Sequence, residues 1–279
     1  MLSHFAAESG VPLSAEPIIN FLGLHITNSM LFGLIMAVIV LVFFTQAAKR
    51  STLHPNSKFG FAVESMIEFV LNIAEENFGD RKKALKFLPL LLTLFTFILF
   101  SNLSGLIPGV GTINIGTNDG VSPLLRPFTT DLNATLALAI LTIGTVQFAA
   151  LRELGVKRHL QHYFTNKPYN PMNLFIGLIE VMGEFIRVIT LSMRLFGVIY
   201  AGEVLLHVIG DIAGNFSPIA TLPVYLLEIF FCLIQAYVFM LLTTVYLAMA
   251  THHEDGSESD HSTDTPITQA VVSGAKSVS

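Results

Sequence analysis

The stretch Val188-Ile-Thr-Leu-Ser-Met-Arg-Leu-Phe-Gly-Val-Ile-Tyr200 is apolar enough to lie inside a lipid bilayer, yet it carries one arginine, Arg194. Placing a guanidinium at the centre of a membrane costs roughly 3 kcal/mol on insertion scales. The group cannot avoid this cost by releasing its proton, because arginine stays charged in proteins. A permanent charge in such a segment indicates an ion pathway; the alternative is an ion pair that locks two helices together.

The composition of the whole chain predicts an all-α integral membrane protein. Of 279 residues, 52% are hydrophobic and 13% charged, and the mean hydropathy is +0.66. A segment of about 20 apolar residues can span the hydrocarbon core. Four stretches lack Lys, Arg, Asp and Glu, namely Pro17–Ala48, Phe87–Asn118, Leu132–Leu151 and Ile229–His253. The region Asn173–Val208 is also apolar but carries charges. We therefore expect five transmembrane helices.

The distribution of basic residues predicts the orientation. With the N-terminus outside, the two inside loops hold eleven Lys and Arg residues, whereas the outside segment between spans two and three holds only Arg126. This asymmetry follows the positive-inside rule. We expect an outside segment at 1–27, a membrane domain at 28–251 and an acidic, disordered inside tail at 252–279. Neither a cleaved signal peptide nor a transit peptide is evident, so a bacterial inner membrane is the expected location; an organelle-encoded copy, which would also lack a transit peptide, is the alternative.

Two further elements follow from periodicity and length. Apolar residues at helical spacing over Phe59–Phe78 alternate with glutamates, which predicts an amphipathic helix on the inner surface. Helices over Asn173–Gly210 and Val224–Ala250 would be about 55 and 40 Å long at ~1.5 Å per residue. Both exceed the hydrocarbon thickness of about 30 Å. These lengths predict a long, strongly tilted hairpin that turns at Gly214–Pro218.

Helical projection places the polar residues of this hairpin on two faces of its first helix and on one face of its second helix. One face of the first helix carries Arg194, Arg187, Glu180 and Thr190. Glu203 and His207 lie nearly opposite, and Glu228 and Gln235 share a face of the second helix. Carboxylates in apolar surroundings tend to take up protons, whereas an arginine does not release its proton. The pattern suggests two proton paths on either side of a fixed positive barrier.

Plainer interpretations stay open for several of these residues. Glu203 and Glu228 could each be a satisfied polar contact, and Asn102 could be a turn residue before Pro108. Arg187 and Glu184 could be interfacial charges. His252, His253 and His261 could bind a metal weakly, although a solvated tail is favoured and no metal or cofactor is expected. At the level of function, a self-contained secondary transporter and a structural membrane anchor are the alternatives.

Several motifs resemble one known family. Leu191-Ser-Met-Arg-Leu-Phe-Gly197, followed by Tyr200-Ala-Gly-Glu203, is similar to subunit a of the F-type ATP synthase. Ile234-Gln-Ala-Tyr-Val-Phe239 looks like the last helix of that family, and Phe100-Ser-Asn-Leu-Ser-Gly-Leu-Ile-Pro108 and Asp131-Leu-Asn-Ala-Thr-Leu136 look like its middle helices. The resemblance covers about residues 28–250.

The resemblance implies a stator subunit that couples proton flow through two offset half-channels to a rotating ring of c subunits. It gives Arg194 the role of the essential arginine and Gln235 that of its polar partner. Glu203, Glu228 and Asn102 would line the path from the outside, with His207 beside them, and Glu180 the path to the inside. Val198 stands where the family usually has Asn, and Gly105 lacks an acid that some relatives carry.

The resemblance also implies partners and excludes catalysis by this chain. Expected partners are the c ring, the b subunit of the peripheral stalk and the other ATP synthase subunits, together with lipid; no nucleic acid is expected. The sequence holds no Gly-x-x-x-x-Gly-Lys-Ser/Thr loop. ATP chemistry would therefore belong to the partners, and this chain would be non-catalytic.

Overall fold

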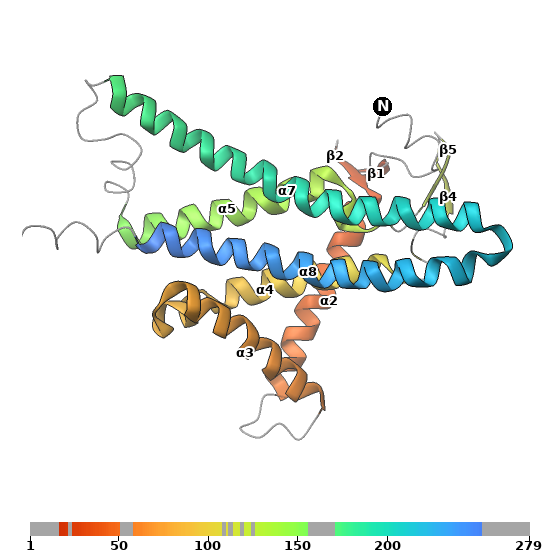
Figure 1. The fold of residues 1–279 in the computed structure, drawn as a ribbon, viewed down its shortest axis with the longest axis horizontal. Coiled ribbons are helices and arrows are strands. Elements are labelled where there is room, and N and C mark those ends of the chain that lie inside the picture. Colours follow the sequence, from red (N-terminus) through yellow and green to blue (C-terminus); the bar gives the residue numbers. More distant parts are fainter. Residues whose placement is uncertain are drawn as a thin grey trace, which may run out of the picture.

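A computed structural model describes residues 17–21, 24–50, 58–107, 110, 114–117, 120–123, 126–155 and 171–252. Helices dominate it, as Figure 1 shows. The long helices are α2 (Asn28–Arg50), α3 (Lys58–Phe78), α4 (Arg81–Gly105), α5 (Leu132–Leu154), α7 (Pro171–Ala213) and α8 (Ser217–His252). Two single 3-10 turns, η1 (Phe128–Thr130) and η2 (Gly214–Phe216), precede α5 and α8. The prediction of an all-α membrane protein is confirmed.

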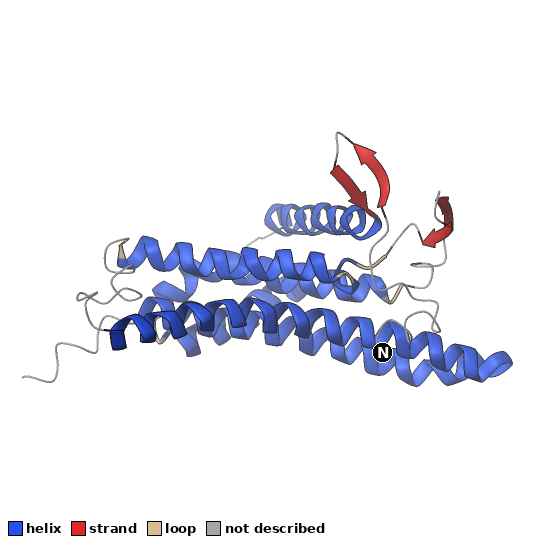
Figure 2. Cartoon of the chain, turned by 90° about the horizontal axis from the view of Figure 1, so that it is seen from above, coloured by secondary structure: helices blue, strands red, loops and turns tan. Residues whose placement is uncertain are grey.

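Two short β-hairpins add to the expected helical architecture. β1 (Pro17–Phe21) pairs antiparallel with β2 (Leu24–Thr27), and β4 (Asn114–Thr117) pairs antiparallel with β5 (Gly120–Pro123). Both hairpins stand apart from the helical layers in Figure 2. They fall in segments that the sequence assigned to outside loops, where β-branched residues between turn-forming types favour local strand pairing. The predicted tail at 252–279 lies outside the described residues beyond His252.

Four stretches of the described residues are long and apolar enough to cross a membrane: Asn28–Lys49, Arg81–Gly105, Leu132–Glu153 and Gly177–Thr251. The fourth contains both α7 and α8. In Figure 1 these two helices run antiparallel along the length of the molecule and turn at one end, while α2 crosses the other helices steeply. The long hairpin is thus present, and its helices extend beyond the predicted bounds, with 43 residues in α7 and 36 in α8.

Local chemistry explains where these helices begin and turn. Asp131 caps α5 by accepting a hydrogen bond from the amide of Asn133, as its position before an apolar run predicts. Gly214 adopts a φ of 51°, a left-handed conformation that glycine reaches without a Cβ clash, and it lies at the predicted turn of the hairpin. Gly79, at a φ of 66°, ends α3 in the same way before Asp80 caps α4.

The core lies where α3, α4 and α8 meet. Fully buried side chains there include Phe78, Leu91, Ile98, Met240 and Leu247. The predicted amphipathic helix is therefore confirmed as α3, and it contributes its apolar face to the bundle. The hydrophobic side chains that remain exposed along α2, α7 and α8 are those of a protein surrounded by lipid or by partner helices.

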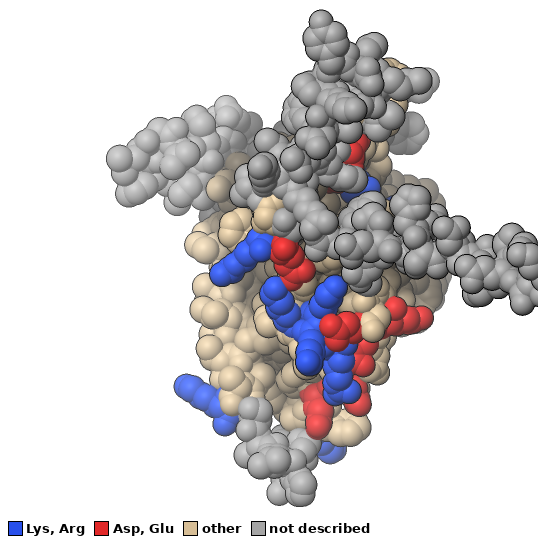
Figure 3. Space-filling view, turned by 90° about the vertical axis from the view of Figure 1, so that its left-hand side faces the viewer, with Lys and Arg blue, Asp and Glu red and all other residues tan. Residues whose placement is uncertain are grey.

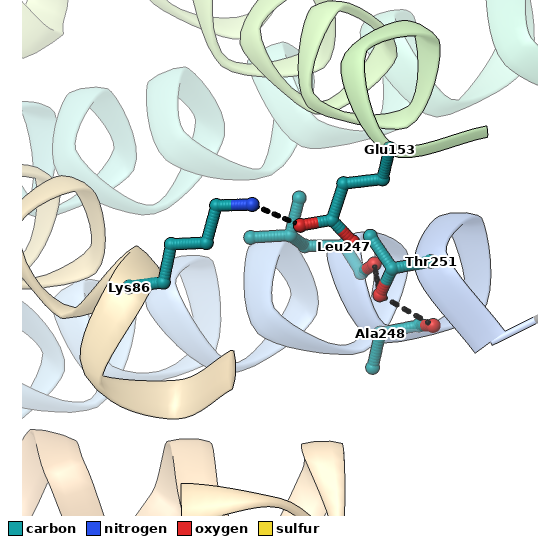
Figure 4. Close-up of polar contacts among 5 residues, drawn as sticks. All are labelled: Lys86, Glu153, Leu247, Ala248 and Thr251. Carbon is teal, nitrogen blue, oxygen red and sulfur yellow. Dashed lines mark hydrogen bonds and ion pairs between the residues drawn. The ribbon is translucent and has the colours of Figure 1, made fainter. Parts of the chain in front are cut away.

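Charged residues gather at one end of the bundle, where α3 ends, α4 begins and α5 ends (Figure 3). Arg81 pairs with Glu75 at 3.3 Å, and Lys86 pairs with Glu153 at 2.5 Å. The second pair joins α4 to α5 beside Thr251 of α8, as Figure 4 shows. Arg81 and Lys86 belong to the first segment that the sequence places inside and Glu153 to the second, so described parts of both segments lie at this end of the bundle.

Candidate functional site

Arg194 lies on the exposed surface of α7. Its side chain is exposed, and it forms no hydrogen bond or ion pair with any other described residue. The neighbouring Met193 is 53% exposed, and Ile186 and Ile189, further back on α7, are 52% and 38% exposed. Among the described residues, Arg194 therefore does not form the ion pair between two helices that the sequence left open as an alternative. The arginine instead presents its charge on an apolar outer face.

Gln235 lies on α8, the second helix of the hairpin, at about the level of Arg194. Close approaches between α7 and α8 set the antiparallel alignment: Gly202 faces Glu228, and Gly210 faces Thr221. Continuing this alignment towards the start of α7 brings the level of Arg194 to the neighbourhood of Gln235. The Gln235 side chain is 4% exposed, and its amide nitrogen has no hydrogen-bond partner among the described residues.

Glu203 and Glu228 come together between the two helices. A Cβ placed on Gly202 would lie 2.6 Å from Oε1 of Glu228, so the absence of a side chain at position 202 lets this carboxylate pack against α7. Glu203 follows directly in sequence. Oε2 of each glutamate is buried without a hydrogen-bond partner among the described residues. The plainer interpretation, that Glu203 and Glu228 are satisfied polar contacts, is therefore not supported for the two Oε2 atoms.

His207 lies near Glu203 but does not bond its carboxylate. Nδ1 of His207 is 2.9 Å from the backbone carbonyl oxygen of Glu203, and the histidine side chain is exposed. The helical spacing predicted that the two residues face one another, and they do share this part of α7. This contact, however, is one that a histidine makes with its own helix.

Asn102 lies at the end of α4 and is 1% exposed. Both polar atoms of its amide, and the hydroxyl of Ser101 beside it, are buried without hydrogen-bond partners among the described residues. The Thr129 hydroxyl in η1 shares this property. η1 packs against both α4 and α7, and Gly105 at the end of α4 closely approaches Pro127 just before η1, so these groups lie in one part of the bundle. Buried polar groups are normally bonded, so such a concentration marks a site rather than a packed core.

Glu180 lies on the other side of Arg194. It precedes the arginine by fourteen positions in α7, and Glu203 follows it by nine, which correspond to about 21 and 14 Å at ~1.5 Å per residue. Glu180 is partly buried. Between Glu180 and Arg194, Arg187 pairs with Glu184 at 2.5 Å and lies 4.9 Å from the ring centroid of Tyr246 in α8. The predicted residues thus form two separate polar regions with Arg194 between them.

Sequence reasoning missed Arg126, which it treated only as the lone basic residue of an outside loop. The structure buries this side chain to 2% exposure between η1 and the helices. It also missed Ser192, whose hydroxyl lies 3.3 Å from that of Thr135 and joins α7 to α5. A single arginine followed by Pro127 in an otherwise cation-free segment was the available signal. No group of three or more potential metal ligands occurs within the described part of the chain.

Comparison with known proteins decides the family. The family model described as ATP synthase A chain matches residues 30–248. The chain belongs to the ATP synthase subunit a family. It is 34% identical over 225 residues to ATP synthase subunit a of Campylobacter jejuni subsp. jejuni serotype O:23/36, covering 80% of this chain and 89% of the relative. It is 32% identical to that of a Sulfurihydrogenibium species, covering 81% and 98%.

A more distant match has the same name: ATP synthase subunit a 2 of Chlorobaculum tepidum is 31% identical, covering 84% of this chain and 64% of the relative. As a subunit a, the chain is a multi-pass membrane protein and a non-catalytic component of the membrane sector of ATP synthase. It acts in proton translocation within a complex with other ATP synthase subunits. The resemblance seen in the Arg194 motif is therefore confirmed at the level of the whole membrane domain.

Proposed function

We propose that this subunit forms the stator wall of the proton path, with two offset half-channels separated by Arg194. The observation that carries the proposal is the exposed Arg194 charge on an apolar face of α7, without a partner among the described residues. A membrane protein gains nothing by presenting such a charge to lipid. A moving carboxylate on a partner, such as a ring of c subunits, would supply the missing opposite charge.

The outer half-channel uses Glu203, Glu228 and Asn102, with His207 at its edge. One buried oxygen of each glutamate and the Asn102 amide have no hydrogen-bond partner among the described residues, so they can exchange hydrogen bonds with water and with a passing proton. A proton delivered through them neutralises a ring carboxylate, which can then enter lipid without carrying a bare charge. Gln235, level with Arg194, provides a polar group where the carboxylate meets the arginine.

The inner half-channel uses Glu180, on the far side of Arg194 along α7. After the ring has turned, Arg194 attracts the returning carboxylate in its ionised form, and the proton leaves past Glu180. The fixed arginine also prevents protons from passing directly between the two paths, because it neither releases nor relays a proton. A membrane potential contributes about 2.3 kcal/mol per charge per 100 mV to this transfer.

The proposal also covers the location and the membrane orientation of the subunit. We place it in a bacterial inner membrane with five spans, the N-terminus outside and the C-terminus in the cytoplasm, beside the c ring and the b subunits. The gathering of basic residues at the end shown in Figure 3 supports this orientation. The bacterial relatives support the location.

ATP-driven acidification of inverted membrane vesicles tests the proposal. Arg194→Ala is expected to abolish pumping while the complex still assembles. Arg152→Ala, which removes an exposed arginine at the basic end, is the matched control and should pump normally. Undiminished pumping by Arg194→Ala in an assembled complex would exclude Arg194 from the transport path.

A further inference from the structure

Arg126 is a permanent charge buried outside the arginine motif. Its Nε donates to the Thr130 hydroxyl at 3.3 Å, and one terminal nitrogen donates to the Thr130 carbonyl oxygen at 3.2 Å. The Thr130 hydroxyl in turn donates to the Pro127 carbonyl oxygen at 2.9 Å. The guanidinium is thus held by the short segment that it begins, and it is 2% exposed.

The segment 126–131 is itself wedged between helices. A Cβ on Gly33 of α2 would lie 2.3 Å from the Phe128 ring, and a Cβ on Gly105 of α4 would lie 2.9 Å from Pro127. Asp131 accepts a hydrogen bond of 2.6 Å from the Ser29 hydroxyl. The segment therefore cannot shift without moving α2 or α4, which makes the position of the Arg126 charge rigid.

This rigid charge lies close enough to act on Glu203. η1 packs against α7, and the Arg126 charge is within electrostatic reach of Glu203 and Tyr200. Glu228 is in turn within reach of Glu203. A buried guanidinium and a buried carboxylate each offset part of the other's cost of leaving water, and removing one alone leaves the other uncompensated. His207 also lies within electrostatic reach of Glu203, but its side chain is exposed, as is that of Arg194, whereas Arg126 is a buried permanent charge.

We propose that Arg126 is a positioning residue of the outer half-channel, a fixed cation that holds the Glu203 carboxylate in the buried cluster with Glu228. The proposal rests on the function proposed above for Glu203. The packing of segment 126–131 fixes the position of the Arg126 guanidinium, and this guanidinium fixes the Glu203 carboxylate. The proton path then keeps a constant geometry while the ring turns past it.

Passive proton conduction tests this role in vesicles that carry the assembled complex and have been stripped of its ATP-hydrolysing sector. Arg126→Gln keeps hydrogen-bonding capacity but removes the charge, and we expect conduction to fall about tenfold or more. Arg126→Lys keeps the charge and should restore most of it. Thr130→Ala, which keeps the arginine but removes one bond, should give a smaller loss. Equal conduction by Arg126→Gln and the unmodified protein would overturn the proposal.

Thermal stability of the purified complex provides a readout independent of transport. Arg126→Gln and Glu203→Gln should each lower the unfolding temperature, whereas the double variant should lose less than the two losses added together. Strict additivity would show that the two charges do not act on each other and would overturn the proposal. If Arg126→Gln alone fails to assemble, recovery of assembly in the double variant would support it, and failure of both would count against it.

The two proposals fail differently in these experiments. Normal conduction by Glu203→Gln would remove the glutamate from the path and with it the proposed function of the outer half-channel. Blocked conduction by Glu203→Gln, together with normal conduction by Arg126→Gln, would leave the path intact and refute only the role of Arg126.

Discussion

Arg194 combines two properties that a packed membrane helix does not need: a permanent charge and an exposed position among apolar side chains. Charge alone would also be supplied by lysine at this position. The two cations differ, because a buried ammonium changes its protonation readily while a guanidinium stays charged and can bond a carboxylate through two nitrogens. The barrier proposed here needs a cation that stays charged, as a guanidinium does.

We therefore predict that Arg194→Lys lowers ATP-driven proton pumping by about tenfold or more without preventing assembly. Acidification of inverted vesicles measures the effect, with the amount of this subunit in the purified complex as the assembly control. Normal pumping by Arg194→Lys would show that any cation suffices and would contradict the barrier role.

Gly202 matters because its lack of a side chain leaves room for the Glu228 carboxylate. An added methyl group at this position would approach Oε1 of Glu228 to 2.6 Å and Cδ to 3.0 Å, so the carboxylate must move. We predict that Gly202→Ala lowers passive proton conduction about tenfold by displacing Glu228, a change equivalent to about 1.4 kcal/mol. Gly144→Ala in α5, where an added Cβ meets nothing within 4 Å, is the control. Conduction that is equal in both variants would show that the Glu228 position is not critical.

At the scale of elements, the turn between α7 and α8 depends on Gly214. Its φ of 51° is strained for a residue with a side chain, by roughly 1–2 kcal/mol. We predict that Gly214→Ala destabilises the subunit by about 1 kcal/mol, because the hairpin must relax or carry this strain. Thermal denaturation of the purified complex is the measurement, again with Gly144→Ala as the control. An unchanged unfolding temperature would mean that the turn adapts freely.

The hairpin also shows which elements could be predicted from sequence. The turn at Gly214, the cap at Asp131 and the amphipathic α3 follow from local signals: a flexible residue, a capping side chain and a helical apolar period. The shared buried face of Glu228 and Gln235 follows from their seven-residue spacing in a helix. These predictions needed no knowledge of how distant parts of the chain pack.

What the sequence did not predict depends on such packing. Arg126 is buried because the segment after it folds back between Gly33 and Gly105, residues of two different helices. His207 was expected to face Glu203, but its ring nitrogen contacts the Glu203 backbone carbonyl oxygen, which a side chain four residues further along a helix can reach. Helical projection places a residue on a face and does not choose its partner.

At the scale of the whole molecule, the start of α4 and the end of α5 lie at one end of the bundle and the α7–α8 turn lies at the other, as Figure 1 shows. Lys82, near the start of α4, and Asn215, in η2, are both exposed. Cys232 is 1% exposed, so the unmodified chain offers no accessible thiol among the described residues. These features allow a direct test of orientation.

We predict that a membrane-impermeant maleimide labels Lys82→Cys in inverted vesicles and Asn215→Cys only in right-side-out vesicles. The positive-inside bias is the physical reason, since the basic end stays on the side where the chain was made. The unmodified protein controls for reaction at Cys232, and permeabilised vesicles should label both variants. The reverse pattern would invert the orientation and exchange the two half-channels, while labelling of both variants from the same side would show that the hairpin does not cross the membrane.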